Sequence, residues 1–422
     1  MKVQEVFTPN GYPEHTYVER ERENLEKNLK NSLRMRGSIV ELSGPSKAGK
    51  TMLVRKLRED GFIGELAEIK GSNIDSKADL WNLAMDDLGL PTSTSREETT
   101  TEETGEKGKA GVSAGPIQIG GEAHSKNSDA VTQSQSHNRR GVRDIINFVD
   151  LDDFVLLIDD FHYIDEDLQP AIAESIKGAA EKGISVCVAV VGYRSENLEK
   201  VNPDLAGRVK RIELDYWKDE DLRKIAEKGF DTHLNVELDE RTISSLVQES
   251  AGSPQLMQLL CFSLCIAADI YDPSDTTRNV VVKREKGREL FTEAIDWAGF
   301  ESVVETINDG KEPRGEGRKL YELNDDGTGD YYRVCLKAIA ENPPKFSFHR
   351  NDLFERVKQV CVDDHPKKNQ ITNFCENMIE LVENERPRAD FVEWDEKEDY
   401  LHISEPGFLF TIRWAIRLDM LE

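Results

Sequence analysis

The chain has 422 residues, which is enough for two or three domains rather than one. Lys and Arg number 55 against 81 Asp and Glu, a formal net charge of −26. This balance excludes a mostly basic nucleic-acid coat protein, because neutralising phosphates needs a surplus of cations, although one local basic patch stays compatible with it. A hydrophobic fraction of 38% is enough for folded cores and argues against disorder of the whole chain.

The first part of the chain predicts alternating helices and strands. Leucines at helical spacing indicate a helix within residues 19–34, followed by a short β-type run at 38–43. A second helix is expected to begin at Met52, a further strand at 66–69 and a further helix at 78–88.

The composition changes at residues 91–140, where Thr, Ser, Glu, Gly and Lys dominate and helical periodicity vanishes. Weak alternation at 110–123 leaves two interpretations open, a β-hairpin inside a flexible insertion or a disordered loop.

Regular patterns return with a predicted helix at 142–149. Wholly apolar runs at 154–158 and 184–191 are typical of strands that are buried on both faces of a parallel sheet. A helix at 168–180 separates them, and an edge strand is expected at 209–214. Alternating strands and helices predict a doubly wound α/β domain.

The remaining chain is mostly helical by pattern. Residues 219–272 predict a small all-helical domain, and the polar, Gly- and Asp-rich residues 301–330 predict a linker or exposed loop. Residues 331–403 predict three helices followed by a β-hairpin, which is the order of a winged helix. The expected helices are 331–341, 350–360, 369–384 and a final one at 408–421, and the hairpin strands are 391–394 and 400–403.

No apolar run approaches the ~18–20 residues that a membrane helix needs, and the first twenty residues lack the apolar stretch of a signal peptide. The six cysteines form no Cys-x-x-Cys pair and stand among apolar neighbours, which is typical of reduced core thiols. These features predict a cytoplasmic protein that has no membrane partner.

The strongest motif is Gly44-Pro-Ser-Lys-Ala-Gly-Lys-Thr51, which fits GxxxxGK[ST] between a predicted strand and a predicted helix, the context of a phosphate-binding loop (P-loop). In such a loop the backbone N–H groups surround a phosphate, Lys50 supplies a positive charge, and Thr51 offers a hydroxyl to Mg²⁺. The residues expected to hold the nucleotide here are Gly44, Pro45, Ser46, Lys47, Ala48, Gly49, Lys50, Thr51 and Met52.

A second motif, Phe154-Val-Leu-Leu-Ile-Asp159-Asp160, delivers two carboxylates to the carboxyl end of an apolar strand. We expect Asp159 to hold Mg²⁺ and Asp160 to polarise the attacking water. Many buried strands end in Asp, so this run gains its meaning from the P-loop. Together the motifs predict a protein that binds ATP or ADP with Mg²⁺ as cofactors and hydrolyses ATP.

The two motifs resemble those of AAA+-related P-loop ATPases, more narrowly of the signal-transduction branch (STAND) and of the origin-recognition-like ATPases, over roughly residues 7–272. The run Tyr17-Val-Glu-Arg-Glu21 is similar to the F-V-G-R-E box, which implies that Val18 and Arg20 lie against the adenine. Glu19 stands where the family prefers Gly. The Asp159-Asp160 pair resembles that of the signalling branch and implies slow hydrolysis, since most AAA+ machines carry Asp-Glu.

Three further positions receive roles only through this resemblance. Arg194 stands where the family keeps a reader of the γ-phosphate, with a surface arginine as the alternative. Arg208 precedes a strand where relatives place an arginine finger that reaches a neighbour's nucleotide, and an ordinary surface arginine is again the alternative. Gly252-Ser-Pro254 resembles the G-x-P motif, whose proline lies against the nucleotide, while the plainer interpretation is a helix N-terminus.

Residues 403–414 resemble the D-P-x-F-x-F-x-x-R-W ending of prokaryotic ATPases of this group, in which a winged helix follows the lid. Residues 331–422 carry 13 Lys and Arg against 18 Asp and Glu, a net charge of −5, whereas a DNA reader normally shows a basic stripe. We therefore expect a protein-binding or autoinhibitory role for this domain in preference to DNA binding.

The resemblance implies a nucleotide-dependent switch that hydrolyses ATP slowly and controls assembly with a separate effector or regulatory protein, in bacterial antiviral defence or signalling. A homo-oligomer is expected. The alternatives are a DNA-binding AAA+ ATPase of replication-initiator or transposition-regulator type and an ATP-binding scaffold that never hydrolyses. The eight histidines show no metal-ligand spacing.

The predicted fold class is α/β, a P-loop parallel sheet followed by an all-α lid and a C-terminal winged helix. The predicted domains are an N-terminal segment 1–34, a P-loop ATPase domain 35–214 with an insertion at about 91–140, a helical lid 215–300, a linker 301–330 and a winged-helix domain 331–422.

Overall fold

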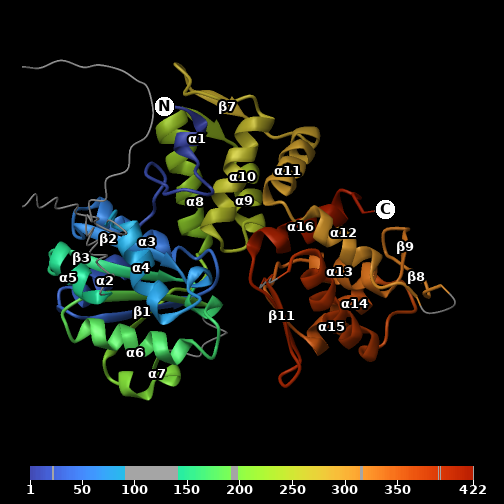
Figure 1. Cartoon of the computed structure of the whole chain (residues 1–422). Coiled ribbons are helices and arrows are strands. Elements are labelled where there is room, and N and C mark those ends of the chain that lie inside the picture. The colour runs from blue at the N-terminus through green and yellow to red at the C-terminus, as the bar shows by residue number, and fades with distance from the viewer. Residues whose placement is uncertain are drawn as a thin grey trace, which may run out of the picture.

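The computed structural model describes residues 1–20, 23–90, 141–191, 198–313, 317–387, 389 and 391–421. Glu21, the predicted insertion at 91–140 and Arg194 therefore lie outside the described residues. Figure 1 shows an α/β domain, a helical domain next to it and a C-terminal domain that ends in helix α16.

A five-stranded parallel sheet forms the centre of the α/β domain, with the strand order β2-β3-β4-β1-β5. The three inner strands are almost wholly buried, whereas the edge strands β2 and β5 carry exposed charged residues. The strands are β1 (Ile39–Gly44), β2 (Glu65–Lys70), β3 (Phe154–Asp159), β4 (Ser185–Val191) and β5 (Val209–Glu213). The predicted α/β class with a parallel P-loop sheet is confirmed.

Helices cover both faces of this sheet. On one face, α2 (Leu25–Leu33) and α3 (Lys50–Glu59) bury their leucines against alternate residues of the strands. On the other face, α4 (Lys77–Asp87), α5 (Val142–Phe148) and α6 (Gln169–Ala180) pack on the remaining strand residues, with the short α7 (Leu198–Val201) beside them. Burial of both faces explains why the inner strands β3 and β4 read as continuous apolar runs.

The helical domain is built from α8 (Asp219–Glu227), α9 (Glu240–Glu249), α10 (Pro254–Ala267) and α11 (Arg284–Ala298). A π-helical turn, Lys228–Leu234, follows α8. The short strands β6 (Val236–Leu238) and β7 (Arg278–Val280) pair in parallel, so the expectation of an all-α lid was wrong in this detail. Each of these strands has only three residues, too few for a period-2 pattern to stand out in the sequence.

The first residues of the chain belong to the helical domain. Helix α1 (Val3–Val6) packs on α10 and on the π-helical turn, near the top of the helical domain in Figure 1, and Val3, Val6, Phe7 and Val18 are buried in the same cluster as residues of α8 and α10. The predicted N-terminal segment and helix over 1–34 thus comprises two parts that pack in different places. Its apolar residues divide between two cores, because α2 packs on the sheet instead.

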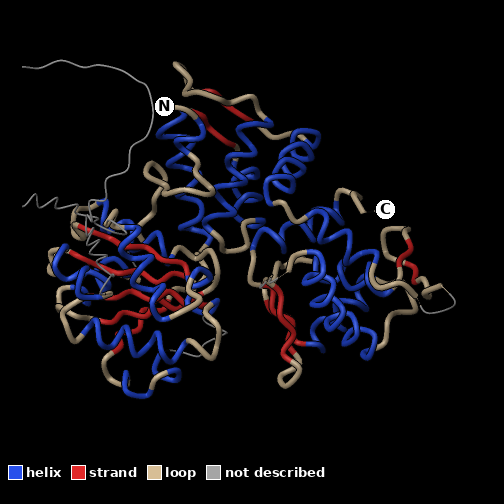
Figure 2. Tube along the Cα trace, viewed as in Figure 1, coloured by secondary structure: helices blue, strands red, loops and turns tan. Residues whose placement is uncertain are grey.

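The C-terminal domain contains α13 (Tyr331–Ala340), α14 (Arg350–Val360), α15 (Lys368–Glu385) and α16 (Pro406–Arg417). Its three strands form an antiparallel sheet in the order β10-β12-β11, and Figure 2 shows this sheet beside the helices. The strands are β10 (Ser347–His349), β11 (Val392–Asp395) and β12 (Tyr400–Ile403). The chain order from α13 to β12 is helix, strand, helix, helix, strand, strand, with β10 absent from the prediction.

The polar composition of residues 301–330 predicted a linker or an exposed loop, but the structure has a helix and a pair of short strands in this stretch. Helix α12 (Glu301–Asp309) buries Val303, Val304 and Ile307 in the C-terminal core, and β8 (Tyr321–Glu322) pairs with β9 (Thr328–Gly329). Three buried apolar residues on one face of α12 are sufficient to fix it against the domain.

Helix α16 joins the C-terminal domain to the helical domain. Its Arg413 and Arg417 pair with Glu249 of α9 at 3.0 Å and 2.9 Å, and the indole N–H of Trp414 donates to the same carboxylate at 3.0 Å. Arg413 and Glu249 are both buried. The buried carboxylate of Glu249 thus accepts hydrogen bonds from three side chains of α16, and this cluster connects the helical domain to the C-terminal domain.

All six cysteines are buried free thiols, as predicted. Within the described ranges, no helix combines the length and the apolarity that crossing a membrane requires.

Candidate functional site

The P-loop leaves β1 and enters α3 through a sharp turn. The backbone of Gly49, which caps α3, has φ +100°, and Lys47 has φ +59°, so both lie in the left-handed region. A Cβ atom on Gly44 would lie 2.3 Å from the carbonyl oxygen of Leu214, which explains why only glycine fits there. The first turn of α3 leaves its N–H groups without helical partners, and these groups favour an anion.

Lys50 is the first residue of α3 and is buried. Its ammonium donates to the carbonyl oxygens of Gly44 at 3.0 Å and Pro45 at 2.8 Å. Burial lowers the pKa of Lys50 to about 8, although Asp160 and Asp159 act in the opposite direction. Since an ammonium has three N–H donors, two carbonyls leave one N–H for a ligand.

Thr51 and Asp159 meet beside Lys50. The Thr51 hydroxyl donates to Oδ2 of Asp159 at 2.6 Å, and the N–H of Asp160 donates to Oδ1 of Asp159 at 3.1 Å. Burial, with the neighbouring Asp160 charge, raises the pKa of the Asp159 carboxyl. The structure thus brings together the hydroxyl and the carboxylate that the two motifs assign to Mg²⁺.

These two side chains fit Mg²⁺, which takes oxygen ligands and is usually held by one or two protein groups together with substrate phosphates. In the described part of the chain, no group of three or more His, Cys, Asp and Glu side chains is arranged to hold a metal ion by itself. A bound phosphate would therefore have to complete the coordination at Thr51 and Asp159.

A cavity of about 360 Å³ opens in front of these groups. This volume lies within the ~300–1,000 Å³ typical of small-molecule sites. Its lining includes most of the predicted site residues, namely Val18, Arg20, Ser46, Lys47, Ala48, Gly49, Lys50, Thr51, Met52, Asp159, Asp160 and Pro254. Gly44 and Pro45 are not in this lining and act through the carbonyls that hold Lys50.

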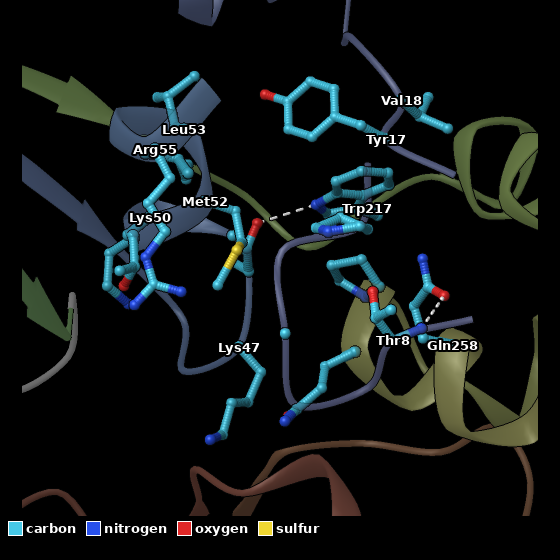
Figure 3. Close-up of a pocket in the computed structure, with 18 of the residues that line it drawn as sticks. Thr8, Tyr17, Val18, Lys47, Lys50, Met52, Leu53, Arg55, Trp217 and Gln258 are labelled. Carbon is cyan, nitrogen blue, oxygen red and sulfur yellow. Dashed lines mark hydrogen bonds between the residues drawn. The ribbon is translucent and has the colours of Figure 1, made fainter. Parts of the chain in front are cut away.

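Figure 3 shows the two sides of the cavity, with Lys50 and Met52 on the P-loop side and Val18 on the other. Trp217 stands between the two sides, and its indole N–H donates to the carbonyl oxygen of Ala48 at 2.9 Å. Arg20 lies over the Trp217 ring at 5.3 Å and donates to the carbonyl oxygen of Asp215 at 3.0 Å. Arg20 thus packs against Trp217 and helps to fix its ring at the cavity.

Several lining residues were missed from the sequence. Residues 8–18, which we call the N-terminal wall, include seven further residues that line the cavity. Trp217 and Gln258 are two more lining residues. Gln258 follows Pro254 by four positions on α10, a spacing that places both on one helix face and could have identified it. Trp217 stands outside any motif, so no local signal could have found it. The missed members of the N-terminal wall are Thr8, Pro9, Asn10, Gly11, Pro13, Thr16 and Tyr17.

Arg208 lies outside the cavity of its own chain. It directly precedes β5, whereas the P-loop follows β1, and parallel pairing places these points at opposite ends of the sheet. Its guanidinium pairs with Glu181 at 3.0 Å, and both side chains are about half exposed. The predicted reader Arg194 lies outside the described residues.

The C-terminal domain also reaches the P-loop. Glu405, which caps α16, stands 3.9 Å from the ammonium of Lys47. Burial raises the pKa of the Glu405 carboxyl, and Lys47 opposes this effect. A second cavity of about 520 Å³ lies here, and its lining shares Lys47 and residues 8–11 with the first.

No protein-family model matches this chain, and neither does any curated protein. Among solved structures, Cdc6p of Pyrobaculum aerophilum is similar at 14% identity, with 99% of each chain covered and a TM-score of 0.44. The Orc1 protein of Aeropyrum pernix, solved in complex with DNA, is similar at 12% identity, with 100% of this chain and 98% of that chain covered and a TM-score of 0.44. The Thermotoga maritima RuvB Holliday junction branch migration motor is similar at 14% identity, with 96% of each chain covered and a TM-score of 0.40. Identities this low describe a likeness of fold alone.

Proposed function

We propose that the protein is a Mg²⁺-dependent ATPase of the AAA+ type that acts as a slow nucleotide-dependent switch. The observation that carries this proposal is the arrangement of Lys50, Thr51 and Asp159 at the mouth of one cavity. A buried ammonium, free helix N–H groups and a hydroxyl–carboxylate pair are the groups that a polyphosphate with Mg²⁺ requires.

Each residue would have a separate task. Lys50 would bind the β- and γ-phosphates, while Thr51 and Asp159 would hold Mg²⁺, which when bound neutralises phosphate charge. Asp160, which follows β3 with φ +54°, would orient the attacking water and accept its proton. Asp is one methylene shorter than the Glu of most AAA+ machines, which is consistent with slow turnover.

Phosphate release from ATP tests this proposal in the unchanged chain and in the variants Lys50→Ala and Asp160→Asn. We expect Asp160→Asn to lower the rate by at least about a hundredfold, the order of magnitude of one lost acid–base group, and Lys50→Ala to lower it at least as much because it removes a phosphate-binding charge. ATP binding should be lost only with Lys50→Ala. Equal, near-zero rates in all three proteins would contradict hydrolysis and favour the scaffold alternative.

For the C-terminal domain we infer a winged helix that binds protein. The order α13-β10-α14-α15-β11-β12 supports the winged helix, and the net charge of −5 over residues 331–422 supports a protein partner. The partner would be a separate effector or regulatory protein, in bacterial defence or signalling. We expect these events in the cytoplasm, where ATP is available and the six buried thiols stay reduced.

The alternative is a DNA-binding AAA+ ATPase, as a replication initiator or transposition regulator. It predicts tight duplex binding whose affinity falls steeply with salt, because bound phosphates release counterions. Fluorescence anisotropy with a labelled duplex at several salt concentrations separates the two. Absent or salt-independent binding would count against the DNA-binding function.

A further inference from the structure

Gln258 is a buried polar residue inside the candidate site. It lies on α10 of the helical domain, it is 4% exposed, and it lines the cavity. Its side-chain oxygen accepts from the N–H of Thr8 at 3.2 Å, and its side-chain nitrogen donates to the Thr16 hydroxyl at 2.6 Å. One amide thus holds both ends of the N-terminal wall, and Figure 3 shows Gln258 beside Thr8.

The bond to Thr16 continues into α1. The Thr16 hydroxyl donates to the carbonyl oxygen of Val6 at 3.1 Å, and Thr16 is 1% exposed. Two further contacts tie the wall to the helical domain, from Lys228 to the carbonyl oxygen of Tyr17 at 2.6 Å and between His233 and the carbonyl oxygen of His15 at 3.1 Å. These contacts fix Thr8, His15 and Thr16 of the N-terminal wall to the helical domain and to α1, while Tyr17 also donates to Glu26 of α2 at 2.9 Å and lies under Lys56 of α3.

The wall stands at the end of the cavity that would receive the base. The phosphates would lie at Lys50 and Thr51, so the rest of a nucleotide must extend away from the P-loop. Val18 of the wall, together with Leu214 and Ile225 elsewhere in the lining, is a buried apolar residue. These apolar side chains suit the face of a flat heteroaromatic ring, and the polar residues of the same lining offer partners for the edge of the ring.

We propose that Gln258 is a positioning residue that fixes the N-terminal wall against the base of a bound nucleoside triphosphate. The inference rests on the proposed nucleotide function and deepens it. Gln258 acts through Thr8 and Thr16 and leaves the phosphates to the P-loop. Because Gln258 belongs to α10, contacts between the N-terminal wall and the base would couple binding of the base to the position of the helical domain.

The test compares ATP with inorganic tripolyphosphate, which carries the same phosphates without a base. Calorimetry in the full chain measures the dissociation constants of both for Gln258→Leu and Thr16→Val. We expect ATP affinity to fall about tenfold in each variant, the scale of a lost buried hydrogen bond, with tripolyphosphate affinity unchanged. Thr16→Ser keeps the hydroxyl and should restore ATP affinity.

Gln248→Leu is the matched control, since Gln248 is an exposed glutamine of α9 outside the cavity lining, and it should bind ATP normally. If Gln258→Leu does not fold, as judged by circular dichroism, the Thr16 pair carries the test. Unchanged ATP affinity, or an equal loss for ATP and tripolyphosphate, would overturn the positioning role. Failure of the unchanged chain to bind ATP would overturn the proposed function itself and this inference with it.

Discussion

At the scale of single residues, the buried ammonium of Lys50 makes the proposed ligand affinity depend on pH. The free protein has a pKa of about 8 for Lys50, because burial disfavours the charged form. Below this pH the lysine already carries the proton that a phosphate needs. Above it, binding must take up a proton, so affinity is lost as pH rises through about 8.

We therefore expect the dissociation constant for ATP to rise above pH 8, by up to about tenfold per pH unit. Calorimetry between about pH 7 and 9.5, in buffers of different ionisation enthalpy, measures the affinity and the proton uptake together. Lys50→Arg is the control, because arginine stays charged throughout this range. A flat profile without proton uptake in the unchanged chain would contradict the prediction.

At the scale of elements, Phe7 connects the N-terminal wall to the helical domain. Its ring is buried and lies 4.9 Å from the ring of Phe230. A Cβ atom on Gly229 would lie 2.2 Å from Cζ of Phe7 and 2.3 Å from its Cε1. The glycine therefore makes room for the ring that anchors α1.

Gly229→Ala should lower the free energy of unfolding by about 1–3 kcal/mol, the usual cost of overpacking a core. Urea denaturation measures this change. Gly178→Ala is the matched control, because Gly178 lies within α6 and its added Cβ would meet no atom within 4 Å. If the two variants unfold alike, the contact between Gly229 and Phe7 does not constrain α1.

Individual elements were predictable where one pattern covers the whole element. The apolar runs of β3 and β4 follow directly from the sequence, because both faces of these strands are buried. The P-loop and the two carboxylates at the end of β3 were found from their motifs. Strand β10 was missed because it has three residues, of which only Phe348 is buried. Helix α12 was missed because charged residues surround its three core residues.

The rest of the cavity depends on contacts between distant parts of the chain. Gln258 and Thr16 are 242 positions apart, and Trp217 and Ala48 are 169 positions apart. Periodicity reports the environment of neighbouring residues and carries no information about such pairs. The side of the site that would meet phosphate was therefore predictable from local motifs, while on the side that would meet the base only Val18, Arg20 and Pro254 were predicted, through a family resemblance.

At the scale of the whole molecule, the buried Glu249 joins two domains. Glu249→Ala would leave Arg413 buried without its carboxylate, which typically costs about 3–5 kcal/mol of stability. Guanidinium denaturation followed by tryptophan fluorescence measures the loss, since Trp414 contacts the same carboxylate.

Glu240→Ala is the control for this experiment. Glu240 pairs with Arg223 at 2.6 Å on the surface, and exposed pairs contribute little because water and salt screen them. We expect this variant to unfold like the unchanged chain. Comparable stabilities for both variants would mean that the Glu249 carboxylate does not hold the domains together.

Arg208 lies away from the cavity of its own chain, so a role for it in ATP hydrolysis requires an assembly of several copies of the chain. If it completes a neighbour's site, Arg208→Ala and Lys50→Ala should each lack ATPase activity alone and regain part of it when mixed. Arg36→Ala, which removes another exposed arginine with a surface ion pair, should keep full activity. Absence of rescue in the mixture would show that Arg208 is not an arginine finger.

Helix α16 has a geometric consequence for the cavity. Its N-cap residue Glu405 contacts Lys47 of the P-loop, and Arg413 further along contacts Glu249 of the helical domain. Because an α-helix has a fixed length, the P-loop and the helical domain cannot move apart while both contacts are intact. The contact between Lys47 and Glu405 is longer, at 3.9 Å against 3.0 Å, and more exposed than the contact between Arg413 and Glu249, so it is the weaker of the two and must break first. A phosphate at the P-loop would compete with Glu405 for Lys47. The ligand itself would therefore weaken the contact between α16 and the P-loop.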